Sequence, residues 1–277
     1  MIVFLNGRFL DAGKAKISVF DHGFLFGDGV YETMRTYGGK IWQMREHLLR
    51  LRHSAGLLGI PVPWTGKQIS QWVYKAVRLN KFSESRIRIT LTRGVNHYDF
   101  IGAKKPTLCI QVSKLIPEPE SVYKDGVKTI SFPMTRLLPE AKSINLLPMI
   151  LAQRAMQKRH AYEAMFVDTK KYVREGTITN VFIVKGCILT TPKTGVLSGM
   201  TREAVVHVAV KLGFKVIFKD FTLRRLVNSD EVFITNSPRG IIPVVQIDGH
   251  RIASGKPGPS TILLMKSFDE YIRKNLT

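Results

Sequence analysis

One lysine stands where its chemistry needs an explanation. Lys142, in the stretch EAKSINLLPM, lies between a proline-containing turn at 138–139 and a run that reads as a helix from about Pro148. Its neighbours are mostly small or apolar. Burial among such groups lowers the pKa of a lysine from its usual value of about 10.4, and the neutral amine is then a nucleophile that forms a Schiff base with an aldehyde. The alternative is an ammonium group that reaches water along the edge of a strand.

Three further sets of residues supply the partners that an aldehyde cofactor with a phosphate requires. Besides the lysine, a pyridoxal phosphate site needs a carboxylate for the ring nitrogen, an anion cradle and a substrate pocket. VREGTITNVFIV places Glu175 just before a strand, and GVLSGMTREAV places Met200 and Thr201 at a helix start, where N–H groups and the helix dipole favour an anion. Arg50, in REHLLRL, carries a guanidinium fork that suits phosphate. As alternatives, Glu175 is an exposed turn residue and Arg50 is one more charge on a basic helix.

The elements that must position these residues mix helices and strands throughout. Period-two runs, turn residues and apolar spacing of three and four predict a first series of elements, with strands at 2–5, 8–10, 16–19, 85–93 and 107–114, a hairpin of 30–37 and 40–44 around Gly38-Gly39, and helices at about 45–58 and 66–80. The second series has strands at 126–132, 163–168, 180–184, 187–191, 231–235 and 244–247, and helices at about 198–212 and from about 259.

A change in composition divides the two series. LIPEPESVY has two prolines, two glutamates and no periodic pattern, which is typical of a linker. We therefore predict a small α+β domain at 1–115, an interdomain linker at 116–121 and a larger, cofactor-binding domain at 122–277. The fold class is α+β, with two mixed α/β domains and the cofactor cleft between them, because small-molecule sites favour such interfaces.

Charge and composition argue against several other classes of protein. The net charge is +21 over 277 residues and the pI is about 10.1, but the basic residues are spread and follow no nucleic-acid-binding motif. No apolar run approaches the roughly 18 residues of a membrane span, and the N-terminus does not resemble a signal peptide. The two cysteines read as small core residues in a reducing cytoplasm, and no histidines or cysteines have metal-ligand spacing.

Six motifs in order make the sequence similar to a known family. They are DHGFLFGDGVYETMRTY, EHLLRL, AKSINLL, YEAMFVD with VREGTITNVFIV, TP with GVLSGMTR, and DEVFITNS with PV. Together they resemble the fold-type IV pyridoxal-phosphate enzymes, which comprise branched-chain aminotransferases, D-amino-acid aminotransferases and 4-amino-4-deoxychorismate lyases. The likeness runs almost from end to end. It implies the D-amino-acid aminotransferase-like fold, pyridoxal 5'-phosphate as cofactor, and a homodimer.

The resemblance also implies a role for each matching residue. Lys142 would carry the cofactor as a Schiff base and then act as general base, and Glu175 would face the pyridine nitrogen. Leu197 would pack on the ring face. The remaining residues implied by the match are Arg50, Met200, Thr201, Asn236 and Ser237 for the phosphate and Tyr31 for the substrate side.

The residues that distinguish the branches of the family give mixed indications. The D-amino-acid branch traps the substrate carboxylate with an arginine and a histidine shortly after a TRG segment, and the matching positions here are Tyr98 and Phe100, with Arg93 and His97 nearby as possible substitutes. Arg88 matches an arginine of the branched-chain substrate pocket and one in some lyases, and Arg239 has no clear counterpart. We therefore predict an aminotransferase acting on an amino acid or amine and a 2-oxo acid, with Arg88, Arg239 or both as the carboxylate trap and Tyr98 in the substrate pocket. The alternative is an aminodeoxychorismate lyase, and a remoter one is a basic nucleic-acid-binding protein without enzymatic activity.

Overall fold

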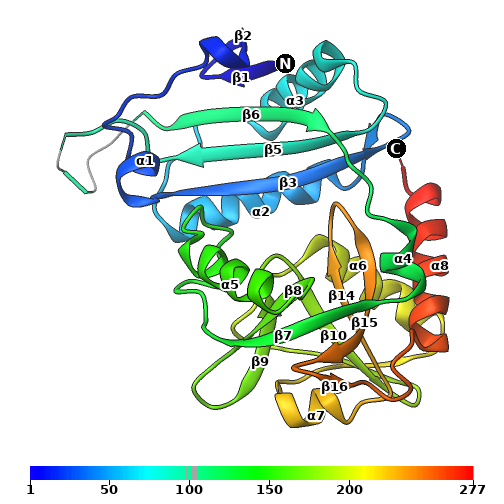
Figure 1. Ribbon diagram of the computed structural model, residues 1–277. Coiled ribbons are helices and arrows are strands. Elements are labelled where there is room, and N and C mark those ends of the chain that lie inside the picture. Colours follow the sequence, from blue (N-terminus) through cyan, green and yellow to red (C-terminus); the bar gives the residue numbers. More distant parts are fainter. Residues whose placement is uncertain (98, 101–104, 277) are drawn as a thin grey trace. The chain divides into compact units, whose positions relative to one another are not determined.

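The chain folds into two compact units, each built around its own sheet. The structure is a computed structural model that describes residues 1–97, 99–100 and 105–276 (Figure 1). Unit 1 comprises Met1–Ile116, the short segment Ala141–Asn145 and Leu276, and unit 2 comprises Pro117–Glu140 and Leu146–Asn275. The segment that carries Lys142 therefore packs with unit 1, whereas the sequence had led us to assign it to the larger domain.

Unit 1 is an antiparallel sheet with helices packed on it. The strand order is β2-β1-β6-β5-β3-β4. The strands are β1 (Ile2–Leu5), β2 (Arg8–Asp11), β3 (Gly29–Tyr37), β4 (Lys40–Ile41), β5 (Ser85–Thr92) and β6 (Thr107–Lys114). The helices are the 3-10 turn η1 (Ala12–Lys14), α1 (His22–Phe26), α2 (Met44–Leu57) and α3 (Gly66–Asn80).

Local sequence explains the main turns and helix ends of unit 1. Gly38 and Gly39 both have positive φ, 58° and 79°, as a two-residue hairpin between β3 and β4 requires. Helix α3 starts with a capping box in which Thr65 and Gln68 bond each other's backbone N–H groups. Helix α2 packs on β3 and α3 on β1, β5 and β6, and the apolar faces so buried form one core.

Unit 2 is a mixed sheet. The strand order is β12-β11-β10-β14-β15-β7-β8-β9-β13, with β16 paired to β15, and β7 runs parallel to both β8 and β15. The strands are β7 (Val127–Pro133), β8 (Glu163–Val167), β9 (Tyr172–Gly176), β10 (Asn180–Lys185), β11 (Ile188–Thr191), β12 (Lys215–Phe218), β13 (Phe221–Thr222), β14 (Glu231–Asn236), β15 (Gly240–Ile247) and β16 (His250–Arg251).

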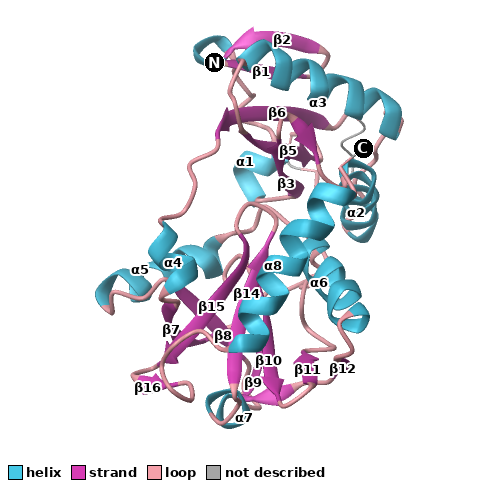
Figure 2. Cartoon of the chain, turned by 90° about the vertical axis from the view of Figure 1, so that its right-hand side faces the viewer, coloured by secondary structure: helices cyan, strands magenta, loops and turns pink. Residues whose placement is uncertain are grey.

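Helices lie on both sides of the central strands of unit 2. They are α4 (Glu120–Lys124), α5 (Leu147–Lys158), α6 (Met200–Lys211), α7 (Leu223–Val227) and α8 (Pro259–Lys274). Figure 2 shows α6 and α8 together on one side of β14 and β15, with α4 and α5 on the other. Valines and isoleucines of the strands form one core with residues of α4 and α7, and α5 packs on a second cluster that includes Ile130 and Phe166.

The predicted mixture of two α/β regions is confirmed, with differences in single elements. The stretch 16–19, predicted as a strand, has no regular structure because it pairs with no described strand. Strand β9 was not predicted, so Glu175 lies within a strand and not in a turn before one. Part of the LIPEPESVY stretch forms the short helix α4.

Candidate active site

Lys142 is fixed to the edge of β3 through its backbone. Its carbonyl oxygen accepts a hydrogen bond from the Tyr31 N–H at 2.8 Å, and the Ile144 N–H donates to the Gly29 carbonyl at 2.9 Å. The Lys142 N–H donates to Ser54 Oγ on α2 at 3.1 Å. A Cβ atom on Gly29 would lie 2.8 Å from the backbone carbonyl oxygen of Leu91 and 2.8 Å from Ile144 Cδ1, and because the carbonyl cannot move aside easily, the close approach requires glycine. The lysine is thus held by two elements of unit 1 while its side chain stays half-buried.

Two cationic side chains meet the ring of Tyr31, which is only 6% exposed. Lys142 Nζ lies 4.7 Å from the ring centroid, and the Arg88 guanidinium carbon on β5 lies 4.0 Å from it. Both contacts have cation–π geometry. Arg88 Nε also donates to Thr90 Oγ1 at 3.3 Å, and burial lowers the pKa of Arg88, which nevertheless stays charged. The structure therefore brings together three of the predicted residues, Lys142, Tyr31 and Arg88.

Arg50 forms part of a buried charge cluster with His47, also on α2, and with Glu32, the residue that follows Tyr31 on β3. Its Nε and Nη2 donate to the two carboxylate oxygens of Glu32, each at 2.7 Å, and His47 Nδ1 lies 2.7 Å from Glu32 Oε2. Burial opposes the charge of Glu32, but Arg50 and His47 outweigh it and lower the pKa of Glu32 to about 2. Burial lowers the pKa of His47, aided by the charges of Arg50 and Lys142, so a neutral imidazole donates its Nδ1 proton to the carboxylate.

Glu175 is fixed in unit 2 with both of its oxygens engaged. It is 5% exposed, on β9. Arg136 Nε donates to its Oε1 at 2.7 Å, and the Leu197 N–H donates to its Oε2 at 2.9 Å. Arg136 also donates to the carbonyl of Pro139. Glu175 and Leu197, which were each predicted to meet the cofactor ring, are therefore in direct contact with each other, and neither this contact nor the one with Arg136 was predicted.

The first turn of α6 has the properties of an anion cradle. Met200 is its first residue, Gly199 precedes it, and no side chain of the described residues caps this end. The Thr201 hydroxyl is buried and has no hydrogen-bond partner among the described residues, and the same holds for Thr235 on β14, against which α6 packs. Buried hydroxyls without partners are costly, so a phosphate group that accepts from Thr201 and the helix amides fits this end of α6. The residues present therefore fit the phosphate of a pyridoxal cofactor.

The remaining predicted residues lie at the turn between β14 and β15, with one exception. Asn236 ends β14, and its side-chain oxygen accepts from the Arg239 N–H at 3.0 Å, with Ser237 between them in the turn. Arg239 Nε pairs with Glu118 Oε1 at 2.6 Å, and its guanidinium lies over Tyr162. Tyr98 lies outside the described residues.

Sequence reasoning missed Glu32, His47 and Arg136. A signal existed for the first two, because a carboxylate in a strand-like run precedes a helix with His47 and Arg50 three apart on one face. For Arg136 there was none, since its partner Glu175 is 39 residues away.

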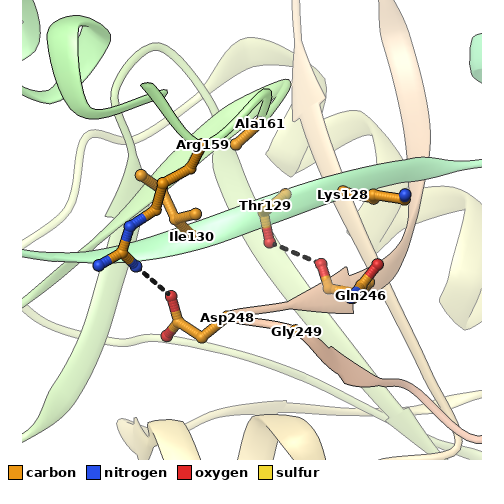
Figure 3. A pocket seen from close by; sticks show the side chains of 8 residues that line it. All are labelled: Lys128, Thr129, Ile130, Arg159, Ala161, Gln246, Asp248 and Gly249. Atoms are coloured by element: carbon orange, nitrogen blue, oxygen red, sulfur yellow. Dashed lines mark hydrogen bonds and ion pairs between the residues drawn. The ribbon is translucent and has the colours of Figure 1, made fainter. Parts of the chain in front are cut away.

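A pocket of about 260 Å³ lies elsewhere in unit 2 (Figure 3). It has Lys128 on β7 on one side and the ion pair of Arg159 and Asp248, 3.6 Å apart, on another. None of the predicted site residues lines it. In the part of the chain that the structure describes, no cluster of three His, Cys, Asp or Glu side chains could hold a metal ion, and no helix is long and apolar enough to cross a membrane.

Comparison with known proteins relates this geometry to one family. The model of the family described as "Amino-transferase class IV" matches residues 29–247. A putative branched-chain-amino-acid aminotransferase of Methanocaldococcus jannaschii is 38% identical over 99% of this chain and 97% of its own length. A D-alanine aminotransferase of Staphylococcus haemolyticus is 33% identical over 98% and 97%.

A solved structure agrees over the whole fold. The branched-chain aminotransferase of the thermophilic archaeon Thermoproteus uzoniensis, solved with norvaline, superimposes with a TM-score of 0.91, at 27% identity over 99% of this chain and 95% of that one. These relatives are named as aminotransferases, and the lyase alternative gains no support from them. The chain belongs to the class IV aminotransferases, which transfer amino groups with pyridoxal 5'-phosphate as their cofactor.

Proposed function

We propose that Lys142 provides the amine that binds the cofactor and that Glu175 faces its ring nitrogen. When bound, pyridoxal 5'-phosphate supplies an aldehyde and a ring that accepts electrons. The proposal rests on the position of Lys142. Its backbone is hydrogen-bonded to β3 and α2, and its ammonium group lies against the ring of Tyr31. The first turn of α6, with the buried Thr201 hydroxyl, receives the phosphate, and Asn236 and Ser237 complete this part of the site.

We assign proton transfer to Lys142, and the orientation of the cofactor to Glu175 and Arg50. With the cofactor bound, Lys142 Nζ would act as the general base that takes up the proton of the substrate carbon and later gives it back. Glu175, whose carboxylate is fixed by Arg136 and the Leu197 N–H, would hold the ring nitrogen in its protonated form. The two bonds to Glu32 fix the Arg50 guanidinium, in the middle of α2, for its proposed contact with the cofactor phosphate.

Arg88 is the better of the two candidates for the substrate carboxylate. It shares the Tyr31 ring with Lys142, and no carboxylate of the described residues lies within ion-pair distance of it. Arg239 is already paired with Glu118 at 2.6 Å. A half-buried guanidinium without a carboxylate partner suits an incoming carboxylate, which it can bind through two parallel hydrogen bonds.

For the amino donor we propose an L-amino acid with an apolar side chain, and a 2-oxo acid as acceptor. The M. jannaschii relative named for branched-chain substrates supports this choice. The positions of the D-amino-acid carboxylate trap, Tyr98 and Phe100, also carry no cation here. D-alanine, on which the S. haemolyticus relative acts by its name, is the second candidate.

A substrate panel and one covalent label test these assignments. Leucine, isoleucine, valine and D-alanine are offered with 2-oxoglutarate or pyruvate, and p-aminobenzoate release is followed in parallel. Borohydride treatment of the yellow enzyme, followed by peptide mapping, is expected to place the label on Lys142 alone. Arg88→Ala is expected to raise the KM for every amino donor about tenfold or more, and Arg239→Ala to change it less than threefold. A label on another lysine, or unchanged KM values in Arg88→Ala, would refute the corresponding assignment.

A homodimer is proposed on the basis of an exposed apolar surface in unit 1. Large apolar side chains are exposed along 17–26 and near 95–100, and the rings of Phe26 and Phe100 lie 5.1 Å apart. Apolar patches of this kind are typical of interfaces, and a second copy of the chain is the partner that the family resemblance implies. Phe24, 65% exposed, is the probe, because Phe24→Asp is expected to turn a dimer into a monomer in sedimentation velocity. A wild-type protein that sediments as a monomer would contradict the proposal.

We also propose a cytoplasmic location. The prediction that both cysteines are core residues is wrong for Cys187, which is exposed, and Cys109 is half-buried. Both are free thiols, which is usual for proteins kept in a reducing compartment. Fractionation of cells that express the tagged chain tests this location, and recovery from an oxidising compartment would contradict it.

A further inference from the structure

The residue before Glu175 is the centre of an ion-pair network. Arg174 Nη2 lies 2.6 Å from Asp168 Oδ2, and its Nη1 lies 2.5 Å from Asp220 Oδ2. Each of the three side chains is at most a quarter exposed. Burial opposes the charges, but mutual hydrogen bonds raise the pKa of Arg174 and, with Thr194, lower the pKa of Asp220 to about 2. Arg174 and Asp220 are therefore both charged near neutral pH.

The network holds one end of the loop that joins β11 to α6. Arg174 Nη1 donates to the carbonyl and hydroxyl oxygens of Thr194, at 3.1 and 3.0 Å. Asp220 Oδ1 accepts from the N–H groups of Lys193 and Thr194, at 2.8 and 3.1 Å. Three backbone groups of the loop are thus bonded to two charged side chains that are themselves bonded to each other. Charge-assisted bonds of this kind are about twice as strong as neutral ones.

The other end of the same loop is held by Glu175. Its carboxylate accepts from the Leu197 N–H, and the Leu197 carbonyl accepts from Asn180 Nδ2 at 2.8 Å. The pairing of β9 with β8 shifts register between Val173 and Gly176, so Arg174 and Glu175 lie at a β-bulge. From this bulge both side chains bond the same loop, Arg174 at Thr194 and Glu175 at Leu197. The loop ends at Gly199, and Met200 is the first residue of α6.

Between its contacts with Arg174 and Glu175, the loop makes one turn whose backbone conformation favours glycine. Gly195 has a φ of +68°, and a Cβ atom there would lie 3.1 Å from Arg174 Cδ. Left-handed backbone is strained for other residues, and the added methyl group would press on the arginine stem. The turn is therefore shaped against Arg174 itself.

We propose that Arg174, together with Asp168 and Asp220, is a positioning residue that fixes the loop 192–199 for the pyridoxal cofactor. The inference rests on the proposed function, in which Leu197 and the first turn of α6 meet the ring and the phosphate. A loop that is already fixed loses little conformational freedom when the cofactor binds, so the network raises cofactor affinity without touching the cofactor. Arg174 has no part in proton transfer.

The test measures cofactor retention separately from activity. Holoenzymes of the wild type, Arg174→Ala, Arg174→Lys and the control Lys185→Ala are dialysed, and the loss of cofactor absorbance is followed with time. The dissociation constant of re-added pyridoxal phosphate is then measured by fluorescence. Arg174→Ala is expected to bind the cofactor about tenfold more weakly or worse. Arg174→Lys is expected to fall between, because an ammonium group cannot reproduce the planar fork.

Lys185→Ala is the matched control because it removes another ion pair of unit 2. Lys185 Nζ lies 2.6 Å from Asp230 Oδ1, at an exposed position, and neither residue bonds the loop. It is expected to retain the cofactor like the wild type. The free energy of unfolding in urea is measured for every apoprotein, which separates a general loss of stability from a loss of cofactor affinity.

Unchanged cofactor affinity in Arg174→Ala, with a lowered free energy of unfolding, would assign the network a structural role only and overturn the inference. If Arg174→Ala does not fold, Asp220→Asn and Gly195→Ala decide, because both disturb the same turn and are expected to weaken cofactor binding about threefold or more. Glu175→Gln is titrated in the same way. If it too leaves the cofactor spectrum and affinity unchanged, the proposed site is wrong; if only the network variants do so, the site stands and the positioning role does not.

Discussion

Replacing Glu32 by glutamine is expected to destabilise unit 1 strongly. Glu32 is fully buried, and its two oxygens accept from Arg50 Nε and Nη2 and from His47 Nδ1, all at 2.7 Å. Glutamine has the same size, but it has no charge, and one end of its amide is a donor. That donor would face the donors of Arg50 or His47, so the guanidinium is left buried without a full partner.

The size of the effect follows from the pKa of the carboxyl group. Burial opposes ionisation, yet Arg50 and His47 lower the pKa of Glu32 from 4.5 to about 2. At 1.36 kcal/mol per unit, this difference corresponds to a free energy of unfolding on the order of 3 kcal/mol at pH 7. Removing one partner of a buried ion pair costs about 3–5 kcal/mol, which agrees in size.

The pH dependence has a definite sign. The pKa of Glu32 is lower in the folded than in the unfolded protein, so its contribution to stability is complete above pH 4.5 and is lost as the pH falls through about 2. The difference in unfolding free energy between the wild type and Glu32→Gln is therefore expected to be constant from pH 6 to 8. Between pH 4.5 and 2 it should shrink.

Urea unfolding followed by tryptophan fluorescence is the assay, because Trp42, Trp64 and Trp72 all lie in unit 1. Arg50→Met and the double variant complete a double-mutant cycle, in which a coupling energy on the order of 3 kcal/mol is expected. A loss below about 0.5 kcal/mol in Glu32→Gln at pH 7, or effects of the two single changes that simply add, would refute the reasoning.

Three further changes are predicted from single contacts. Gly29→Ala places a Cβ atom 2.8 Å from Ile144 Cδ1 and from the Leu91 carbonyl. We expect a loss of about 1–3 kcal/mol of unfolding free energy and slower borohydride labelling of Lys142, and a wild-type labelling rate would contradict this. Thr201→Val removes a buried hydroxyl without a described partner, so the unfolding free energy of the apoprotein should rise by about 1 kcal/mol. The affinity for pyridoxal phosphate should fall. If the unfolding free energy and the cofactor affinity both fall, the proposed phosphate cradle is contradicted. For Glu163, burial raises the pKa, although hydrogen bonds from Thr177, Ala164 and Thr179 favour ionisation. Its contribution to stability is complete below pH 4.5 and is lost as the pH rises through the folded pKa. Glu163→Gln should therefore flatten the decline in unfolding free energy above pH 4.5. An unchanged pH profile of the unfolding free energy would contradict this prediction.

Elements with strong local signals could be predicted from the sequence. Helices α3 and α6 have apolar residues three and four apart, and α3 also has its capping box, so their ends were placed within about two residues. Strand β9 was missed because YVREG has charged residues at two of its five positions, and only its pairing with β8 and β13 makes it a strand. The stretch 16–19 shows the reverse, since a suitable composition without a partner strand forms no strand.

The residue types of the candidate site could be predicted, but their partners could not. Arg50 and Glu175 were predicted as cofactor-binding residues from their motifs, and the structure shows both buried, with Glu32 and Arg136 bound to them from 18 and 39 residues away. A buried charge needs such a partner, and the sequence alone does not say which of 63 charged residues provides it, since 42 are basic and 21 are acidic.

The apolar surroundings of Lys142 have a different physical origin from the one that the sequence suggested. From the sequence, small and apolar neighbours were expected to bury the amine. In the structure, these neighbours serve the backbone: Ala141 is fully buried, and Ile144 packs on Gly29 where the segment pairs with β3. The side chain itself is only half-buried and rests against Tyr31. The position of the amine therefore depends on backbone hydrogen bonds that any side chain at 142 would retain, so Lys142→Ala should keep the fold of this segment and lose only the chemistry.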